Sequence, residues 1–152
     1  MTALPVPAAV DVLEGCSPGA IPARVFESEV PLLVKGLVAE WPAVVACRQS
    51  LAAAASYLSG FWIEQPVTVY AGDAGMEGRF FYNEDFTGFN FKSGKAHLGQ
   101  VLQKLAEDER SGGGSAIYVG STPVDRWLPG FRAQNDIALP VPDALASFWL
   151  GN

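Results

Sequence analysis

Two stretches of the chain carry apolar residues at helical spacing. In residues 97–107, Leu98, Val101, Leu102 and Leu105 recur at i, i+3, i+4 and i+7, with polar side chains between them. This pattern predicts an amphipathic helix. A second helix is predicted over residues 51–59, because Ser50 can cap its first turn and Gly60 can end it.

Several other segments alternate between apolar and polar residues or run apolar over a few residues, which is typical of strands. We expect strands at residues 31–37, 67–70, 79–82, 89–91, 116–120 and 147–152. Trp41-Pro42 should break the chain, because the residue before proline avoids the helical region. Ser17-Pro18 favours a short helix near the N-terminus, and the glycine-rich run 111–115 favours a flexible loop.

The last of these segments, Phe148-Trp149-Leu150, is a bulky apolar run that predicts a buried strand. The final residues of a domain are usually polar and frayed unless they are tied down. A buried strand at this place therefore favours the interpretation that the chain is one part of a larger fold. We expect the edge of this strand to recruit a partner or a second copy of the chain, so a homodimer is among the expected assemblies.

Composition changes this picture only a little. Hydrophobic residues make up 49% of the chain and charged residues 17%, whereas ordinary domains carry about 25% charged residues. Two interpretations stay open. Some apolar surface faces further protein, or the many alanines and prolines simply inflate the apolar fraction.

The charge and the cysteines limit the function classes. The net charge is −6 and the Lys and Arg residues are scattered, so we expect no nucleic-acid partner. No apolar run approaches the ~20 residues that span a bilayer, and residues 1–10 lack the basic start of a signal peptide, so we expect no membrane partner. Cys16 and Cys47 are interpreted as free thiols in the cytoplasm, with a disulfide between them as the alternative.

Candidate catalytic residues are few. His97 is the only histidine, and zinc or iron sites need several donors, so we interpret it as a solvated or helix-capping residue rather than a ligand. One histidine without a nucleophile elbow also gives no Ser-His-Asp arrangement. Four carboxylates lie close together in sequence and are interpreted as a solvated turn rather than an acid–base pair. They are Asp73, Glu77, Glu84 and Asp85.

Six aromatic residues lie between positions 80 and 91. Such a set commonly forms the core face of one sheet, but its density keeps a substrate-facing platform open as an alternative. The six are Phe80, Phe81, Tyr82, Phe86, Phe89 and Phe91.

The order and spacing of several short motifs resemble one family over nearly the whole chain. The motifs are Pro-Leu-Leu-Val-Lys-Gly-Leu at 31–37 with Trp41-Pro42, Phe-Phe-Tyr at 80–82, Ala-Ile-Tyr-Val-Gly-Ser at 116–121 with Leu-Pro-Gly at 128–130, and Phe-Trp-Leu-Gly-Asn at 148–152. This set is similar to the N-terminal part of the cupin-like, JmjC-type oxygenases, the group that contains the asparaginyl hydroxylase acting on hypoxia-inducible factor.

The resemblance implies an α+β fold in which N-terminal helices and strands lead into an incomplete double-stranded β-helix, or jelly roll. It implies a single domain portion over residues 1–152 that stops before the iron-binding motif. The family binds Fe(II) through a His-x-Asp/Glu…His triad and uses 2-oxoglutarate and O₂ to hydroxylate a protein side chain or a small molecule. Since the triad is missing from this sequence, we expect no catalytic and no metal-binding residue in it, and no activity of the chain alone.

Two residues acquire candidate roles from the same resemblance. Tyr118 aligns with a strand tyrosine whose hydroxyl helps to hold the distal carboxylate of 2-oxoglutarate, and Trp149 aligns with an apolar residue that lines the cosubstrate pocket. The alternatives are a core tyrosine with a satisfied hydroxyl and ordinary strand packing of the tryptophan. A different class of function also stays open, namely a non-catalytic binding or scaffold module that self-associates.

Overall fold

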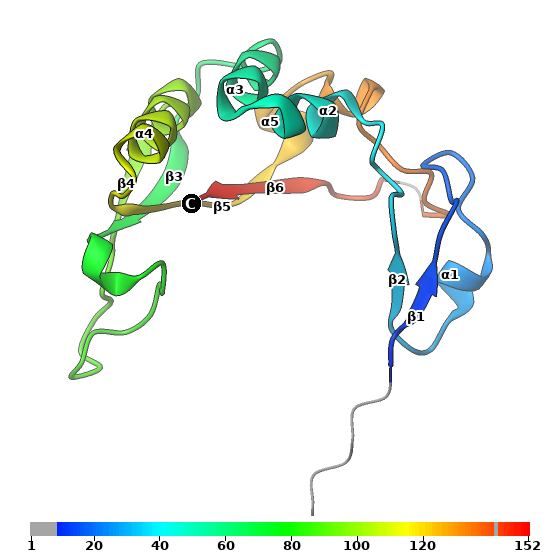
Figure 1. Ribbon diagram of the computed structural model, residues 1–152, viewed down its shortest axis with the longest axis horizontal. Helices are drawn as coiled ribbons and strands as arrows, with labels where there is room; N and C mark the ends of the chain where they lie inside the picture. The colour runs from blue at the N-terminus through cyan, green and yellow to red at the C-terminus, as the bar shows by residue number, and fades with distance from the viewer. Residues whose placement is uncertain (1–8, 142) are drawn as a thin grey trace, which may run out of the picture.

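The computed structural model describes residues 9–141 and 143–152, and its main body is a four-stranded antiparallel sheet with helices on one face (Figure 1). The strand order is β4-β3-β5-β6. These strands are β3 Val67–Gly72, β4 Lys92–Ala96, β5 Ala116–Pro123 and β6 Ser147–Gly151. A parallel pair, β1 Asp11–Leu13 and β2 Leu32–Val34, lies apart from this sheet beside helix α1 Arg24–Glu27.

The remaining helical segments are α2 Pro42–Gln49, α3 Leu51–Ser59, α4 Leu98–Ser111 and α5 Val124–Trp127, with 3-10 turns η1 Ala74–Met76 and η2 Phe131–Ala133. The predictions for α3 and α4 are confirmed. The Ser50 hydroxyl accepts a hydrogen bond from the Ala53 N–H at 3.0 Å, as an N-cap does. Helix α4 ends where Gly112 takes a left-handed φ of 72°, which glycine adopts without steric cost.

The hydrophobic core lies between α3, α4 and one face of the sheet. One buried cluster joins Val101 and Leu105 of α4 to Val67, Ile117 and Val119 of the strands. A second cluster joins Leu98 and Leu102 to Val124 and Leu128, near the end of β5. The four apolar positions recur at helical spacing and therefore lie on one face of α4, which is the face that packs into both clusters.

The predicted strands at 79–82 and 89–91 are wrong. The segment between η1 and β4 is a loop in which a single bridge pairs Tyr82 with Phe89. Here the Asn90 side chain replaces a strand ladder, because its Oδ1 accepts from the Phe81 N–H and its Nδ2 donates to the Arg79 carbonyl, both at 2.8 Å. The strand follows later, as β4.

Two further predictions need correction near the N-terminal half, while the break at Trp41-Pro42 is confirmed and is followed by a helix that was not predicted. Ser17-Pro18 begins no helix, since the Ala20 N–H donates to the Ser17 carbonyl in a tight turn. The predicted strand at 31–37 is shorter and ends at Val34. Trp41 is extended, with ψ 133°, as a residue before proline requires, yet Pro42 then starts α2, because proline suits the first helical position.

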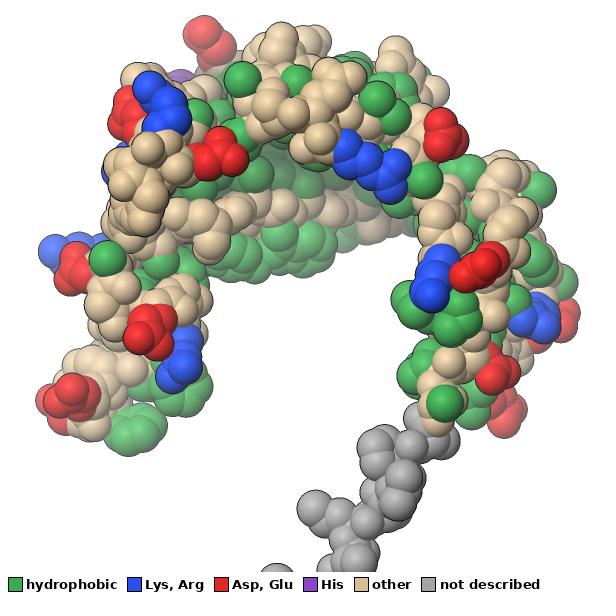
Figure 2. Space-filling model, viewed as in Figure 1, with side chains coloured by type: hydrophobic (Ala, Val, Ile, Leu, Met, Phe, Trp, Pro, Cys, Tyr) green, Lys and Arg blue, Asp and Glu red, His purple; other side chains and the backbone are tan. Residues whose placement is uncertain are grey.

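The face of the sheet that the helices do not cover is open, and hydrophobic side chains gather along it (Figure 2). The final strand forms as predicted, but it is not buried, since Trp149 is 57% exposed on this face. Mixed helices and an antiparallel sheet give the α+β architecture that was expected. The sheets are not closed, so the described residues contain no complete jelly roll.

Two sequence expectations concern composition rather than fold. Cys16 and Cys47 are free thiols. The expected absence of a signal peptide falls mostly on residues 1–8, which lie outside the described residues. Over the part of the chain that the structure describes, none of the helices combines the length and apolar character needed to cross a bilayer.

Candidate functional site

One face of β5 points into the hydrophobic core, and the other face points to the candidate site. Ile117 and Val119 are 6% and 0% exposed and pack beneath α4. Tyr118 lies between them and therefore points to the open face, since side chains alternate along a strand. The strand predicted over residues 116–120 is confirmed, and its alternation places Tyr118 opposite the two core residues.

An aromatic cluster surrounds Tyr118 on the open face. Its strand partner is Tyr70 of β3, and the two rings stack with centroids 6.0 Å apart. Phe80 lies 5.7 Å from the Tyr118 ring, and Phe91 lies 5.5 Å from the Tyr70 ring in an edge-on arrangement. Together with neighbouring residues these side chains border a cavity of 640 Å³, which is the size of a small-molecule pocket.

The hydroxyl groups of this cavity are available to a ligand. Neither the Tyr70 nor the Tyr118 hydroxyl forms a hydrogen bond with another residue that the structure describes, whereas the Tyr57 hydroxyl elsewhere is bonded to Gln134 and Asn135. Ser93 also borders the cavity. A bound carboxylate could accept hydrogen bonds from these hydroxyls.

One cation stands on the same face of the sheet. Lys95 of β4 is the strand partner of Thr68, and its ammonium donates to the Thr68 hydroxyl at 2.7 Å. Lys95 and Tyr70 border a smaller cavity of 320 Å³ next to the aromatic one. The aromatic cavity thus offers hydroxyl donors beside an apolar wall, and the neighbouring smaller cavity offers an ammonium.

Trp149 shares the open face with Tyr118 but does not border the aromatic cavity. Its neighbours Phe148 and Leu150 pack into the two core clusters, so the indole points the other way. In the register, Gly151 rather than Trp149 lies opposite Tyr118. The structure therefore places the two predicted residues on one surface without joining them in one pocket, and their roles stay predictions.

The sequence alone did not predict Tyr70 and Lys95 as residues of the candidate site. The alternation at 67–70 was visible and would have placed Tyr70 on the same face as Thr68. Lys95 was harder to find, because the segment Lys-Ser-Gly-Lys is poor in β-forming residues and predicts no strand. Its position depends on pairing with β3, which the local sequence does not encode.

The described residues do not fit an iron ion. His97 is exposed at the start of α4, where its backbone N–H donates to Oε1 of the Gln100 side chain at 3.0 Å. No group of three or more His, Cys, Asp or Glu side chains in the described parts of the chain is arranged to hold a metal. An iron site would need ligands from elsewhere.

We call residues 80–91 the aromatic loop. The acidic residues near it are exposed, as expected for a solvated turn. Asp73, Glu77, Glu84 and Asp85 are exposed. Hydrogen bonds from the Thr87 side chain and then from its N–H hold the pKa of Asp85 below its ordinary value, because they favour the ionised form. The Asp85 carboxylate thus stabilises the turn of the loop to which it belongs, through its hydrogen bonds with Thr87.

The six rings of the aromatic loop are divided between the two expected arrangements, the core face of a sheet and an exposed platform. Phe80 and Phe91 are half-buried against the tyrosines of the sheet. The other four rings are exposed, and Phe86 is 70% exposed at the tip with a left-handed φ of 58°. Tyr82 and Phe89 stack with centroids 5.2 Å apart, so the loop presents a row of rings beside the cavity.

Comparison with known proteins agrees with this architecture. The family model of the cupin-like domain matches residues 18–152, which is most of the chain. No curated protein matches it. A match of this extent, together with an antiparallel sheet that has one covered and one open aromatic face, shows that the chain belongs to the cupin-like domain family.

Proposed function

We propose that these 152 residues form the N-terminal part of an Fe(II)- and 2-oxoglutarate-dependent oxygenase domain of the JmjC type, related to the asparaginyl hydroxylase group. The enzyme would hydroxylate a protein side chain or a small molecule. One observation carries the proposal. A chain of the cupin-like family holds an apolar cavity in which the hydroxyls of Tyr70 and Tyr118 have no bonding partner in the described residues.

In this proposal, the Tyr118 hydroxyl donates a hydrogen bond to the distal carboxylate of 2-oxoglutarate. The aromatic rings around it exclude water, which strengthens a hydrogen bond to a charged group. Trp149 extends the apolar surface along the same face. Bound 2-oxoglutarate would supply two of the four electrons that reduce O₂, and the substrate C–H bond would supply the other two. The residues described here would only bind and orient the cosubstrate.

The part of the chain that the structure describes holds no ligand set for iron, so in this proposal the ligands would come from residues outside these 152. The open face supports the same idea, because an exposed apolar sheet face is normally covered by a second sheet in sandwiches and jelly rolls. We also propose a cytoplasmic location, supported by the two free thiols, Cys16 and Cys47.

The test is to read the coding sequence on both sides of these residues and to express the complete product. Succinate release from 2-oxoglutarate that depends on added Fe(II) is the expected result, and the 152-residue chain alone should release none. A complete product that neither binds 2-oxoglutarate nor releases succinate would overturn the proposal.

A second candidate function is a non-catalytic binding module that self-associates. One observation favours it: β6 pairs only with β5, which leaves its outer edge without a strand partner in the described residues. Such edges recruit further strands. A complete product with no His-x-Asp sequence, present as a stable dimer, would favour this module over the oxygenase.

A further inference from the structure

The aromatic loop carries a continuous row of rings that runs from its tip to the candidate site. Each ring of the row contacts the next, with centroids between 4.9 and 6.0 Å apart. The row therefore links the exposed end of the loop to the cavity on the open face of the sheet. From the tip to the sheet, its members are Phe86, Tyr82, Phe89, Phe91, Tyr70 and Tyr118.

The outer rings of this row are exposed although they are large and apolar. Phe86 is 70% exposed, Phe89 is 59% exposed and Tyr82 is 49% exposed. Figure 2 shows hydrophobic side chains beside acidic ones at the lower left, where this loop ends. Exposed apolar patches on a protein surface mark interaction sites, so the row is a candidate docking surface.

Hydrogen bonds hold the tip of the loop in one shape. The Asn83 backbone N–H donates to the Gly88 carbonyl, and the Asn83 Oδ1 accepts from the Gly88 N–H, both at 3.0 Å. Between these two residues, Phe86 adopts a left-handed φ of 58°, which is strained for a bulky side chain. The exposed Phe86 ring gains no burial in the core that would offset this strain. Strained residues of this kind cluster at functional sites, where the surrounding structure holds them in place.

The charge at the tip of the loop is negative. Glu84 and Asp85 directly precede Phe86, and both are exposed. Neither carboxylate forms an ion pair with a Lys or Arg side chain that the structure describes. The aromatic loop itself contains no Lys or Arg. Charge complementarity therefore favours a cationic partner and disfavours an anionic membrane surface.

We propose that the aromatic loop docks an arginine-bearing segment of a partner protein. A guanidinium group is planar and positively charged, so it stacks on an aromatic ring and bonds a carboxylate at the same time. A lysine ammonium lacks the planar face, and a neutral sugar lacks the charge. A row of several rings suits an extended peptide better than a free amino acid. Because the row leads to Tyr118, the docked segment belongs to the substrate of the oxygenase, and this last statement alone rests on the proposed function.

The experiment measures how a short fluorescent peptide of alternating arginine and serine binds to the complete gene product, by fluorescence anisotropy without added iron. Two matched peptides replace arginine by citrulline, which has the same shape without the charge, or by lysine, which has the charge without the planar group. The citrulline peptide should bind roughly tenfold more weakly, because it loses both the cation–π contact and the charge-assisted bond. The lysine peptide should bind about threefold more weakly, because it keeps the charge but does not stack.

Substitutions in the loop test the ring and the charge separately. Phe86→Asn removes the ring at the tip while asparagine tolerates the left-handed backbone, so it should weaken binding of the arginine peptide about fivefold without lowering the melting temperature. Glu84→Gln should weaken binding about threefold, as expected for one exposed ion pair. The controls are Phe26→Ala, at a ring of α1 that is 41% exposed, and Glu109→Gln, at an exposed carboxylate of α4. Both controls should leave the affinity for the peptide unchanged.

Three results would overturn the proposal. They are equal binding of the arginine and citrulline peptides, an unchanged affinity for the arginine peptide in the Phe86→Asn variant, and binding of cellopentaose or of phosphatidylcholine vesicles in place of the peptide. Succinate release is measured separately on the same preparation. Peptide binding without succinate release would contradict the proposed oxygenase and leave the docking surface in place. Succinate release without peptide binding would contradict the docking surface alone.

Discussion

Tyr70 and Tyr118 are register partners on neighbouring strands, and their rings stack with centroids 6.0 Å apart on the open face of the sheet. Residues directly opposite each other on one face of an antiparallel pair are close enough for their side chains to interact. The stack fixes the Tyr118 ring while its hydroxyl stays free of any described partner. A phenol held in this way is suited to donate a hydrogen bond to a ligand.

The first prediction concerns this hydroxyl. In the complete gene product, Tyr118→Phe should weaken 2-oxoglutarate binding roughly tenfold to a hundredfold, since a bond to a charged group contributes about 1.5–3 kcal/mol. The melting temperature should stay unchanged, because the hydroxyl makes no bond within the described chain. Titration calorimetry and thermal melting of the same variant measure the two effects.

Tyr57→Phe is the matched control. The Tyr57 hydroxyl accepts from Asn135 at 2.8 Å and donates to Gln134 at 3.2 Å, away from the open face. Its loss should lower the melting temperature and leave 2-oxoglutarate affinity alone. If Tyr118→Phe shows that same combination, Tyr118 is a core tyrosine and not a ligand-binding residue.

Self-association of the isolated chain is the second prediction. Trp149 is 57% exposed on the open face, and the adjoining edge of β6 has no strand partner in the described residues. Light scattering should therefore show a mass that rises with concentration. Trp149→Lys should shift the chain toward monomer, whereas Leu145→Lys, at a residue 80% exposed outside the strands, should not. A cooperatively melting monomer at high concentration would contradict this expectation.

The third prediction tests the core between α4 and the sheet. Leu98 is 1% exposed and packs against Leu128 and Val124. Leu98→Ala should lower the free energy of unfolding by about 2–5 kcal/mol, because it leaves a cavity in addition to losing apolar contact. Leu145→Ala, on the surface, should change it by less than about 0.5 kcal/mol. Urea denaturation measures both, and similar values for the two variants would count against the described core.

The fourth prediction tests how Gly114 closes over Asp108. Gly114→Ala should destabilise the chain by about 1–3 kcal/mol, since the new methyl group would overlap the buried carboxylate. Gly113→Ala is the control, because its Cβ would meet nothing within 4 Å, and its effect should stay below about 1 kcal/mol. Thermal melting compares them, and equal stability of the two variants would mean that the loop does not enclose Asp108.

The sequence by itself determined the elements whose signal is local. The spacing of Leu98, Val101, Leu102 and Leu105 placed α4, and Ser50 with Gly60 bounded α3. Alternation in β5 put Tyr118 on the face opposite Ile117 and Val119. These properties depend on the 3.6-residue and 2-residue periods of helix and strand, which any short window of sequence contains.

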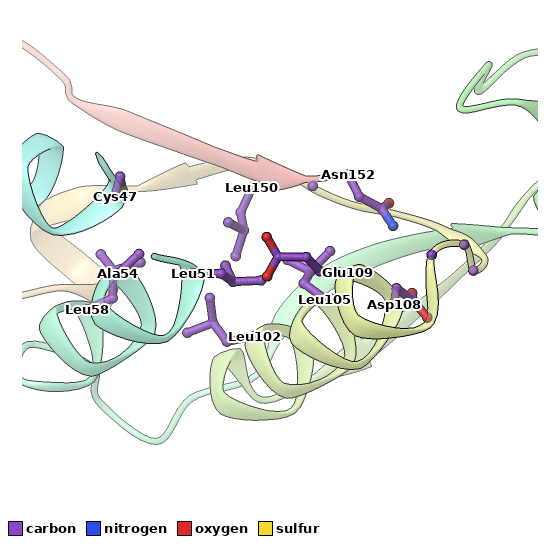
Figure 3. A pocket seen from close by; sticks show the side chains of 14 residues that line it. Cys47, Leu51, Ala54, Leu58, Leu102, Leu105, Asp108, Glu109, Leu150 and Asn152 are labelled. Carbon is purple, nitrogen blue, oxygen red and sulfur yellow. The ribbon is translucent and has the colours of Figure 1, made fainter. Parts of the chain in front are cut away.

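Only the tertiary structure decided what depends on distant pairing. Strand β4 forms through its backbone pairing with β3, although Lys-Ser-Gly-Lys is a poor strand sequence. The aromatic segment before β4 is instead a loop that the Asn90 side chain holds by hydrogen bonds. Trp149 is exposed because the helices cover only the opposite face of the sheet, where α4 packs on Val67, Ile117 and Val119. A cavity bordered by Leu51 of α3, Leu105 of α4 and Leu150 of β6 likewise requires all three elements (Figure 3). No periodicity within one element can reveal which side chains three elements enclose.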